Sequence, residues 1–578
     1  MKEIQNIAIA IIKNDKEFGR AIKNDQIERI GKYLIQNKVS LLELVNRDNC
    51  QWVETLFESS YFKNKITEEE NVLESWESDF RLIRQKWESH GIDYMFHKSV
   101  GTFPYLSDNL DVMVRTKDFQ KAGEVLKEMR YVSLRNIQEA HKEFYRKFIG
   151  DYVVGPIHLH ERVCWGVPFE DLDHIWAKMQ QSESNPLVFY PDYEDGILVN
   201  TAHGFLEDHI IKLKDLLYIK KCIDSTEINW GYIIKTSQKL HWEMSLHAAF
   251  VLLDHLHQNL FNEELLPKEI TEYSEKYISK IPWVNKTIQN LKEKEVIMPF
   301  KTPHLWTRRH TALRTLHDPS FGSKLARYYQ VFGGLADRLV HLKLKFHNQP
   351  GMIIAFSGLD GAGKSQHINS LEKAFNVSEI KTKQVWTRVG SLPLTKLFTR
   401  IYKGKRENKD IQKSVSEPKD RTKNRVIVSF WRILNITDLI FYYGIYVRFQ
   451  KVRLKVVLCD RYYVDTIVDM EAYNKGNIVN RFMYKIYKFL IPKPDINFFI
   501  DASPNIIIKR SEGDIIEDIE FNYNLIRPLA EEENLIPIDN NVSFDEASEK
   551  LIHYSLCRFF SKYPSKYKNY KIVSSRYK

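Results

Sequence analysis

The sequence predicts an α/β protein made of two parts. Residues 348–578 are expected to form a domain with a parallel sheet between helices, because apolar β-branched runs alternate there with helical patterns. Residues 1–347 are expected to form an α+β domain rich in helices, since strand patterns interrupt the helical periodicity only briefly. The turn-forming stretch "HNQPGM" separates the two parts, and 43% apolar residues in a chain of 578 allow a sizeable core.

The N-terminal part changes its pattern along the chain. Residues 1 to about 90 have helical spacing, and "IDYMFH" and "NLDVMV" then resemble short strands. After the second strand, "RTKDFQKAGEVLKEMRYV" predicts a helix capped by Thr116 or Asp118. "EFYRKFIGDYVVGPIHLHERV" predicts a hairpin that turns at Gly150 and Asp151, and helical patterns dominate thereafter.

The net charge of +10 is concentrated in one segment. Residues 381–425 contain fourteen Lys or Arg and four Asp or Glu, an excess of ten. Three interpretations stay open: a solvated insertion, capture of an anionic substrate, or contact with a polyanionic partner. The segment lacks a pattern of stacking aromatics, so nucleic-acid binding is not expected.

The chain is expected to act in the cytoplasm. Its five cysteines lie far apart and form no C-x-x-C, which argues against a disulfide framework or a thiol-ligated zinc site. The N-terminal apolar run is short and has no small-residue cleavage site. The most apolar longer stretch, residues 426–447, is interrupted by Arg432 and Asp438, so it predicts a buried helix rather than a membrane span.

A phosphate-binding loop is predicted at "FSGLDGAGKSQ", residues 356–366. The stretch fits G-x-x-x-x-G-K-[ST] and lies between an apolar strand and a helical pattern. Glycines let the backbone N–H groups of such a loop turn toward phosphate oxygens, and the helix adds its positive N-terminal end. The lysine reaches the β- and γ-phosphates, and the serine hydroxyl can ligate Mg²⁺. The residues predicted to bind the nucleotide are Gly358, Gly361, Ala362, Gly363, Lys364, Ser365 and Gln366.

Three charged residues suggest a phosphate acceptor beside this loop. Asp360 lies inside the loop, where bound phosphates repel a carboxylate unless it faces a sugar hydroxyl or a metal shell. "KVVLCDRYYVDT" predicts a buried strand ending at Asp460 and Arg461, at the ligand-binding edge of a parallel sheet. Asp460 would orient Mg²⁺ or its waters, and Arg461 suits a bidentate grip on phosphate. The alternatives are a solvent-facing loop carboxylate and a surface Asp-Arg pair.

These two stretches resemble the thymidylate kinase family of nucleoside monophosphate kinases, as do "KPDINFFIDASPNIIIKR" and "QVWTRVG". The resemblance covers about residues 350–555. It implies a P-loop kinase domain that transfers the γ-phosphoryl group of ATP to a nucleoside monophosphate, with Mg²⁺ held by Ser365 and Asp460. The catalytic roles that it implies fall on Asp360, Lys364, Arg388, Asp460, Arg461 and Arg510.

A rival interpretation is an ATP-binding switch or scaffold without efficient transfer. It is favoured by the acidic character of the chain after Arg510, where the family has lid arginines. The kinase interpretation is favoured by Asp360 together with Asp460 and Arg461. The expected partner is a small phosphate acceptor, with a nucleoside monophosphate favoured, and a second copy of the chain is a candidate partner in a homodimer.

The N-terminal stretch "FHKSVGTFPYLSDNLDVMV" resembles the uncharacterised nucleotidyltransferases of the polymerase-β-like superfamily. In that superfamily a D-x-D strand and a third carboxylate hold two Mg²⁺ ions. Here Asn109 and Asp111 occupy the D-x-D position, and His158 stands where the third carboxylate is expected. "TAHGFLEDHIIKLKDLLYIKK" resembles the following helices of the family through His203, Lys212 and Asp215.

Three interpretations of this N-terminal pattern stay open. The first is a degenerate or structural domain. The second is an active nucleotidyltransferase that uses Asp108, Asp111 and Glu161 in a shifted register. The third is a transition-metal site, because His158 and His160 share one strand face that could point toward Asp111.

Overall fold

The computed structural model has a mixed α/β structure with a parallel sheet, as the sequence predicts. It describes residues 1–18, 22–97, 109–134, 141–150, 152–163, 168–183, 185–303, 309, 312, 315–316, 322–329, 331–333, 351–378, 380–387, 425–453, 455–471, 478–510 and 516–561. The chain divides into two compact units. Unit 1 is Met1–Arg146, Val154–Leu339 and Ser565–Lys578, and unit 2 is Lys147–Val153 and Val340–Pro564. The predicted boundary at residue 348 lies outside the described residues.

The chain begins with the helices that the sequence predicts for residues 1–90. In the first, the isoleucines recur at helical spacing, and Ile4, Ile7 and Ile11 are buried on one face. Ser40 caps the third helix, since its hydroxyl accepts the amide N–H of Glu43 at 3.1 Å. The bounds are α1 (Lys2–Lys13), α2 (Asn24–Gln36), α3 (Leu41–Val45), α4 (Gln51–Phe57) and α5 (Ser60–Glu88).

A five-stranded mixed sheet follows, in the order β1-β2-β5-β4-β3. Its strands are β1 (Tyr94–Phe96), β2 (Leu110–Val114), β3 (Val132–Leu134), β4 (Lys142–Ile149) and β5 (Tyr152–His160). β2 and β5 are parallel, whereas β1 pairs with β2 and β3 with β4 in antiparallel fashion. The predicted short strands and the hairpin are therefore confirmed. Helix α6 (Phe119–Glu128) begins after Asp118, although the Asp118 side chain makes no capping hydrogen bond.

The rest of unit 1 is mainly helical, as expected. Leu246, Phe250 and Leu253 of the long helix α11 are buried in one core that also contains side chains of α1, α8 and α9. The α-helices are α7 (Leu172–Ala177), α8 (Tyr193–Ala202), α9 (Leu213–Ser225), α10 (Trp230–Lys239), α11 (Glu243–Phe261), α12 (Lys268–Ser279) and α13 (Pro282–Lys292). A π-helical turn, η1 (His203–Glu207), continues α8. The short strands are β6 (Gln180–Gln181), β7 (Phe189–Tyr190), β8 (Ile210–Ile211) and β9 (Phe300–Lys301).

Unit 2 contains the predicted parallel sheet, with five strands in the order β11-β12-β10-β13-β14. The strands are β10 (Met352–Ser357), β11 (Thr382–Trp386), β12 (Val456–Asp460), β13 (Ile496–Asp501) and β14 (Ile536–Asp539). Every neighbouring pair is parallel, so all the carboxyl ends lie at one edge. All of β10 is buried, as expected for the central strand of a covered sheet.

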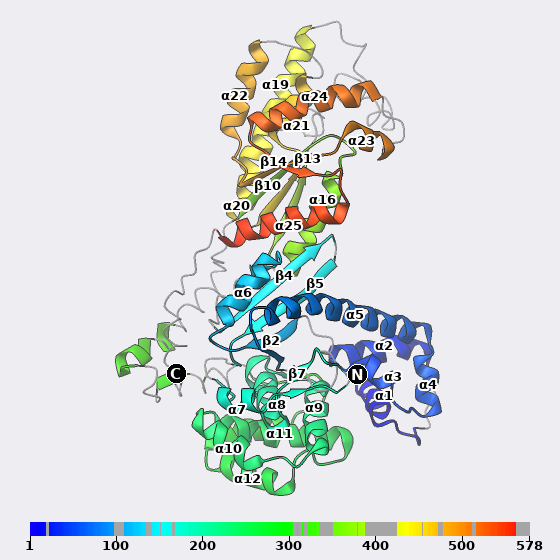
Figure 1. Ribbon diagram of the computed structural model, residues 1–578, viewed down its shortest axis with the longest axis vertical. Coiled ribbons are helices and arrows are strands. Elements are labelled where there is room, and N and C mark those ends of the chain that lie inside the picture. Colours follow the sequence, from blue (N-terminus) through cyan, green and yellow to red (C-terminus); the bar gives the residue numbers. More distant parts are fainter. Residues whose placement is uncertain are drawn as a thin grey trace. The chain divides into compact units, whose positions relative to one another are not determined.

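Helices cover both faces of this sheet (Figure 1). Ile353 and Ala355 share a core with Tyr443 and Tyr487 on one face, and Phe498 contacts the ring of Tyr554 on the other. The elements are α16 (Lys364–Val377), α19 (Arg425–Phe441), η3 (Tyr442–Val447), α20 (Arg448–Val452), α21 (Tyr463–Glu471), α22 (Ile478–Leu490), α23 (Pro504–Arg510), α24 (Ile516–Glu532) and α25 (Phe544–Ser561). The π-helical turn η3 joins α19 to α20.

The apolar stretch 426–447 differs from the expectation of a buried helix. Leu439 and Tyr443 are buried, but Phe441 is 55% and Ile445 62% exposed. Over residues 433–447, whose side chains the structure describes, one face packs in the core and helical periodicity turns the other face outward. Among the described residues, no helix is both long enough and apolar enough to span a membrane.

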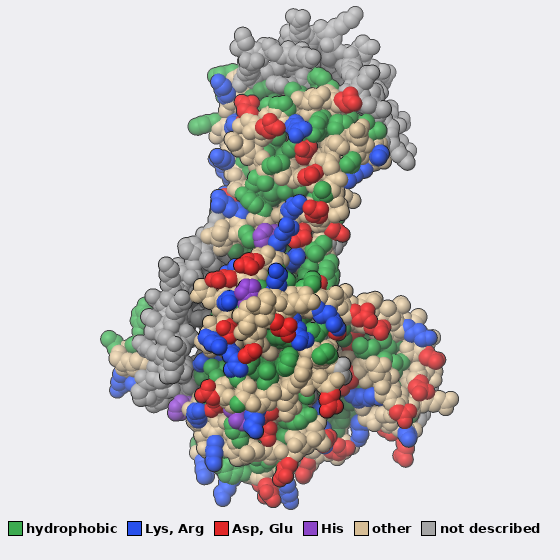
Figure 2. Space-filling model, viewed as in Figure 1, with side chains coloured by type: hydrophobic (Ala, Val, Ile, Leu, Met, Phe, Trp, Pro, Cys, Tyr) green, Lys and Arg blue, Asp and Glu red, His purple; other side chains and the backbone are tan. Residues whose placement is uncertain are grey.

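Two expectations from composition concern the cysteines and the basic segment. The four described cysteines, Cys50, Cys222, Cys459 and Cys557, are free thiols in this structure. Most of the basic segment, residues 388–424, lies outside the described residues, so its three interpretations stay open. On the face shown in Figure 2, Lys and Arg side chains are interspersed with Asp and Glu.

Glu170 should make the stability of unit 1 depend on pH. Its buried carboxyl group accepts the N–H groups of Val163 at 2.8 Å and Phe169 at 3.3 Å, and burial raises its pKa from 4.5 to about 8. The folded state therefore keeps a proton that the unfolded state releases, and the free energy of unfolding falls as pH rises between these two values. The expected contribution of Glu170 to the slope is roughly 1.4 kcal/mol per pH unit. Glu170→Gln should reduce the slope by this amount in urea unfolding followed by circular dichroism from pH 5 to 8.

The control for this experiment is Glu227→Gln, which changes an exposed glutamate of the same unit. It should keep the slope of the wild type. Equal slopes for the wild type and Glu170→Gln would contradict the prediction.

Candidate functional site

The loop of unit 2 that the sequence predicts to bind phosphate has a backbone that requires glycine. Gly361 and Gly363 have φ angles of 81° and 94°, in the left-handed region that other residues rarely adopt. At Gly358 the constraint is space, because a Cβ atom would lie 2.8 Å from the carbonyl oxygen of Ile500. Helix α16 begins directly after Gly363, so its N-terminal N–H groups face the loop.

Lys364 is held over this loop by backbone oxygens. Its ammonium group donates hydrogen bonds to the carbonyls of Gly358 at 2.7 Å and Leu359 at 2.9 Å, and it lies 3.8 Å from the Asp360 carboxylate. The side chain is only 6% exposed. The oxygen atoms of a phosphate can replace these two carbonyl oxygens as hydrogen-bond acceptors. A buried ammonium group in this position therefore suits a phosphate ligand.

Ser365 and Asp460 meet at the carboxyl edge of the sheet. The parallel register of β10 and β12 aligns Phe356 with Asp460, the last residue of its strand. The Ser365 hydroxyl donates to a carboxylate oxygen of Asp460 at 2.9 Å. A hydroxyl and a carboxylate side by side are oxygen donors of the kind that Mg²⁺ prefers.

Arg461 adopts an unusual backbone conformation, with φ of 74°. Its amide N–H donates to the carbonyl of Phe356 at 3.0 Å, and its guanidinium group forms a close ion pair with Asp360. A non-glycine residue at positive φ costs free energy that the surrounding structure must offset, and such residues cluster at functional sites. The predicted acceptor-binding residues Asp360 and Arg461 thus contact each other.

Two residues that the sequence analysis missed brace the loop. The Asp465 carboxylate accepts the N–H groups of Gly358 at 3.2 Å and Tyr462 at 3.1 Å, which ties the loop to the turn after β12. The amide of Asn540 donates to the carbonyl of Ala362 at 2.6 Å and is within 3.1 Å of the His367 ring. Asp465 lies in the quoted stretch "KVVLCDRYYVDT", but nothing in the sequence connects Asn540 to residue 362.

A cleft of about 520 Å³ lies beside the loop. It also exposes Trp386, the last residue of β11, which the sequence analysis did not select. Gly358 and Ala362 belong to the loop but do not line the cleft, and the predicted Arg388 lies outside the described residues. The lining residues are Asp360, Gly361, Gly363, Lys364, Ser365, Gln366, Trp386, Asp460, Arg461 and Arg510.

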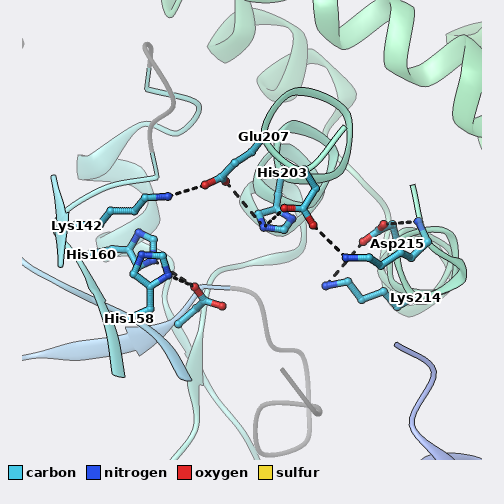
Figure 3. A network of polar contacts seen from close by, with 10 residues as sticks. Lys142, His158, His160, His203, Glu207, Lys214 and Asp215 are labelled. Atoms are coloured by element: carbon cyan, nitrogen blue, oxygen red, sulfur yellow. Dashed lines mark hydrogen bonds and ion pairs between the residues drawn. The ribbon is translucent and has the colours of Figure 1, made fainter. Parts of the chain in front are cut away.

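In unit 1, the predicted convergence of two histidines on Asp111 is confirmed. β2 and β5 align Asp111 with His158 in parallel register. One carboxylate oxygen of Asp111 lies 3.0 Å from His158 Nδ1 and 3.3 Å from His160 Nε2. Figure 3 shows His158 and His160 projecting together from their strand.

Other residues proposed for this site have different positions. Asp108 lies outside the described residues. Glu161 is buried, its backbone N–H donates to the carbonyl of His141, and burial raises its carboxyl pKa. The sequence analysis missed His97, which is fully buried with its ring centroid 4.4 Å from that of His160. His97 directly follows the short strand β1. The available clue to its place near Asp111 was that β1 could pair with β2.

A chain of ion pairs and hydrogen bonds extends through the helices after β5 (Figure 3). The buried Lys142 bonds Glu207 at 2.6 Å, and the His203 ring lies 3.6 Å from Asp208 and 3.9 Å from Glu207. Lys212 in turn lies 3.1 Å from Asp208.

Asp215 has a structural position at the start of α9. Its carboxylate accepts the Lys212 N–H at 2.7 Å, which caps the helix, and Lys214 lies 3.9 Å away. Lys212 and Asp215, two residues through which the sequence resembles the family, thus have a capping role at the start of this helix.

A second group of possible metal ligands in unit 1 comprises His174, Asp192 and Asp195. His174 Nδ1 lies 2.8 Å from Asp195, whose other oxygen accepts the hydroxyl of Tyr232 at 2.8 Å. Asp192 caps α8 through the N–H of Asp195. These contacts satisfy the carboxylates within the protein.

The side chains at Asp111 do not fit a pair of Mg²⁺ ions. Asn109 and His158 stand at two of the three expected carboxylate positions, and neither side chain can bring negative charge. Imidazole nitrogen is also a poor donor for Mg²⁺, which prefers oxygen. These residues therefore do not support a site for two Mg²⁺ ions.

Comparison with known proteins supports the expectation for the N-terminal part. The model of a family described as uncharacterised nucleotidyltransferases matches residues 106–258, which include β2, β5 and η1. No curated protein matches the chain. The match indicates a transferase and a nucleotidyltransferase-like domain. It does not extend to residues 350–555, so the thymidylate kinase resemblance there stays a prediction.

Asn540 should control the rigidity of the phosphate loop. Asn540→Ala removes both of its side-chain contacts and leaves the Ala362 carbonyl and the His367 ring without these partners. A buried polar group that loses its partner costs about 1–3 kcal/mol, so exchange of the amides of residues 358–366 should speed up by about tenfold or more. Hydrogen exchange with mass spectrometry measures this. Asn376→Ala, an exposed asparagine change on the helix α16 that follows the loop, is the control. Unchanged exchange in Asn540→Ala would refute the prediction.

Proposed function

We propose that unit 2 transfers the γ-phosphoryl group of ATP to a small phosphate-bearing acceptor. The observation that carries this proposal is the convergence of nine predicted residues on one cleft, with Lys364 over the loop and Asp460 at the end of β12. Phosphoryl transfer needs positioning and charge stabilisation more than covalent chemistry by the protein. The start of helix α16 beside the loop, together with Lys364, Arg461 and Arg510 in the lining of one cleft, would supply both.

The residues of the cleft suggest how the work is divided. Lys364 would exchange its two carbonyl contacts for the β- and γ-phosphate oxygens, and Arg510 would face the charge that develops during transfer. Ser365 and Asp460 are the residues that would hold Mg²⁺, which neutralises phosphate charge when bound. Arg461 would grip the acceptor phosphate once its contact with Asp360 is released.

A nucleoside monophosphate fits this cleft as acceptor. Arg461 supplies a planar cation for phosphate, and Asp360 an acceptor for a sugar hydroxyl. Trp386 is 56% exposed at the rim of the cleft, and it supports an acceptor with a flat base that stacks on the indole.

Replacing the loop lysine should abolish this transfer. Lys364→Ala removes the ammonium group that would contact the phosphates, so kcat/KM should fall by about a hundredfold to a thousandfold. The measurement is label transfer from γ-labelled ATP to a panel of nucleoside monophosphates with Mg²⁺. Lys373→Ala, an exposed lysine change on the same helix, should keep wild-type activity.

Two outcomes separate this proposal from a nucleotide-dependent switch. Label on one monophosphate, lost in Lys364→Ala and kept in Lys373→Ala, supports the kinase and names its acceptor. ATP binding without transfer to any acceptor would refute the kinase and favour the switch.

Nucleotidyl transfer by unit 1 is a second candidate function, supported by the family match to residues 106–258. The comparisons with known proteins therefore favour this function over the kinase, because the family match lies in residues 106–258. The geometry at Asp111 limits it, since a single carboxylate is aligned with imidazoles there. An active site of this kind would have to work with a different metal arrangement from the one with three carboxylates.

Isotope position distinguishes the two reactions. If unit 1 transfers nucleotides, label from α-labelled nucleoside triphosphates will appear on an acceptor with release of pyrophosphate. Asp111→Asn should then lower that activity by about a hundredfold or more, whereas Lys364→Ala should leave it unchanged. Loss of α-label transfer in Lys364→Ala, with activity retained in Asp111→Asn, would assign the chemistry to unit 2.

A further inference from the structure

Strand register brings three imidazoles to one carboxylate in unit 1. β2 and β5 align Asp111 with His158, and His160 lies two residues further on the same face of β5. β1 aligns Phe96 with Val112 in antiparallel register, and one further step sets His97 opposite Asp111. Three strands therefore contribute to one cluster.

The donor atoms have the spacing of ligands around one ion. His160 Nε2 lies 3.3 Å from the Asp111 oxygen, and donor atoms of His97, Asp111 and His160 all lie within 4.8 Å of one another. Two ligands at about 2.0–2.1 Å from a tetrahedral ion lie about 3.3 Å apart. The Asp111–His160 pair already has this spacing, and the donor atom of His97 lies within 4.8 Å of both.

Burial prepares these side chains to bind a cation. His97 is fully buried and His160 is 3% exposed, and the Nδ1 atom of His160 has no hydrogen-bond partner among the described residues. A buried polar atom needs a partner, and a bound cation would supply one to this ring.

His158 positions the carboxylate rather than completing the cluster. Its Nδ1 lies 3.0 Å from the Asp111 oxygen, and its ring stacks on Phe144 with centroids 3.8 Å apart and planes 18° apart. A partner that fixes the orientation of a ligand is a regular feature of metal sites.

We propose that His97, Asp111 and His160 bind one divalent transition metal ion of the Zn²⁺ type, with His158 orienting the carboxylate. Two nitrogens and one oxygen favour such an ion over Mg²⁺. Three protein ligands leave a coordination position open to water or a substrate oxygen, as in catalytic rather than structural zinc sites. The inference is independent of both proposed transfer reactions.

The test is metal binding by the full chain, without an activity assay. After treatment with a chelator, Zn²⁺ is titrated against a chromophoric competitor, and Co²⁺ is followed by the visible bands of its four-coordinate form. The wild type should bind one equivalent, and millimolar Mg²⁺ should not displace it. Affinity should fall at least tenfold in His160→Gln and in His97→Gln.

Thermal unfolding with and without Zn²⁺ distinguishes a variant that has lost its metal ligand from a variant that does not fold. Zn²⁺ should raise the Tm of the wild type and of the control His174→Gln, which alters the other candidate group, but not that of the isosteric variant Asp111→Asn. Absence of binding by the wild type would overturn the proposal. So would wild-type affinity in both His160→Gln and His97→Gln, or loss of binding in His174→Gln alone.

Discussion

The register of two parallel strand pairs sets the positions of the chemical groups in both units. In unit 2, β10 and β12 align Phe356 with Asp460, so that Asp460 meets Ser365 where the loop enters its helix. In unit 1, β2 and β5 align Asp111 with His158. Side chains alternate along a strand, so a slip of one residue would turn these groups to the opposite face. The buried apolar residues of the same strands oppose such a slip, and the core thereby specifies the sites.

Charge balance in the cleft of unit 2 sets a condition on ligand binding. Asp360 contacts Arg461 directly and lies near Lys364, so two cations share one carboxylate. A polyphosphate brings more negative charge than Asp360 and would compete for both cations. Asp360 is 58% exposed, and it can therefore move away toward solvent or an acceptor hydroxyl at little cost. The contacts with Asp360 thus hold Lys364 and Arg461 in position, and a phosphate ligand could still replace the carboxylate.

The sequence predicts local features of these sites better than tertiary ones. Lys364 follows from a contiguous motif, and Asp460 from its place at the end of an apolar strand. Asn540 braces the same loop from a position 178 residues after Ala362, and no periodicity encodes that contact. The strand ending at His97 was predicted, but the sequence does not show that it pairs with β2, so His97 was not connected to Asp111. Helices and strands follow from short-range patterns, whereas bracing contacts depend on how the elements pack.

Net charge explains why a single ion suits the cluster at Asp111. Three carboxylates with two divalent ions leave a single net positive charge, which favours the phosphates of a nucleotide. Asp111 with two neutral imidazoles and one divalent ion reaches the same net charge. Two ions there would leave an uncompensated excess of positive charge in a buried site, which is costly in a low-dielectric interior. With Asn109 and His158 at two of the expected carboxylate positions, the strands would hold one ion of a different kind in place of two, and the site would keep its attraction for an anionic group.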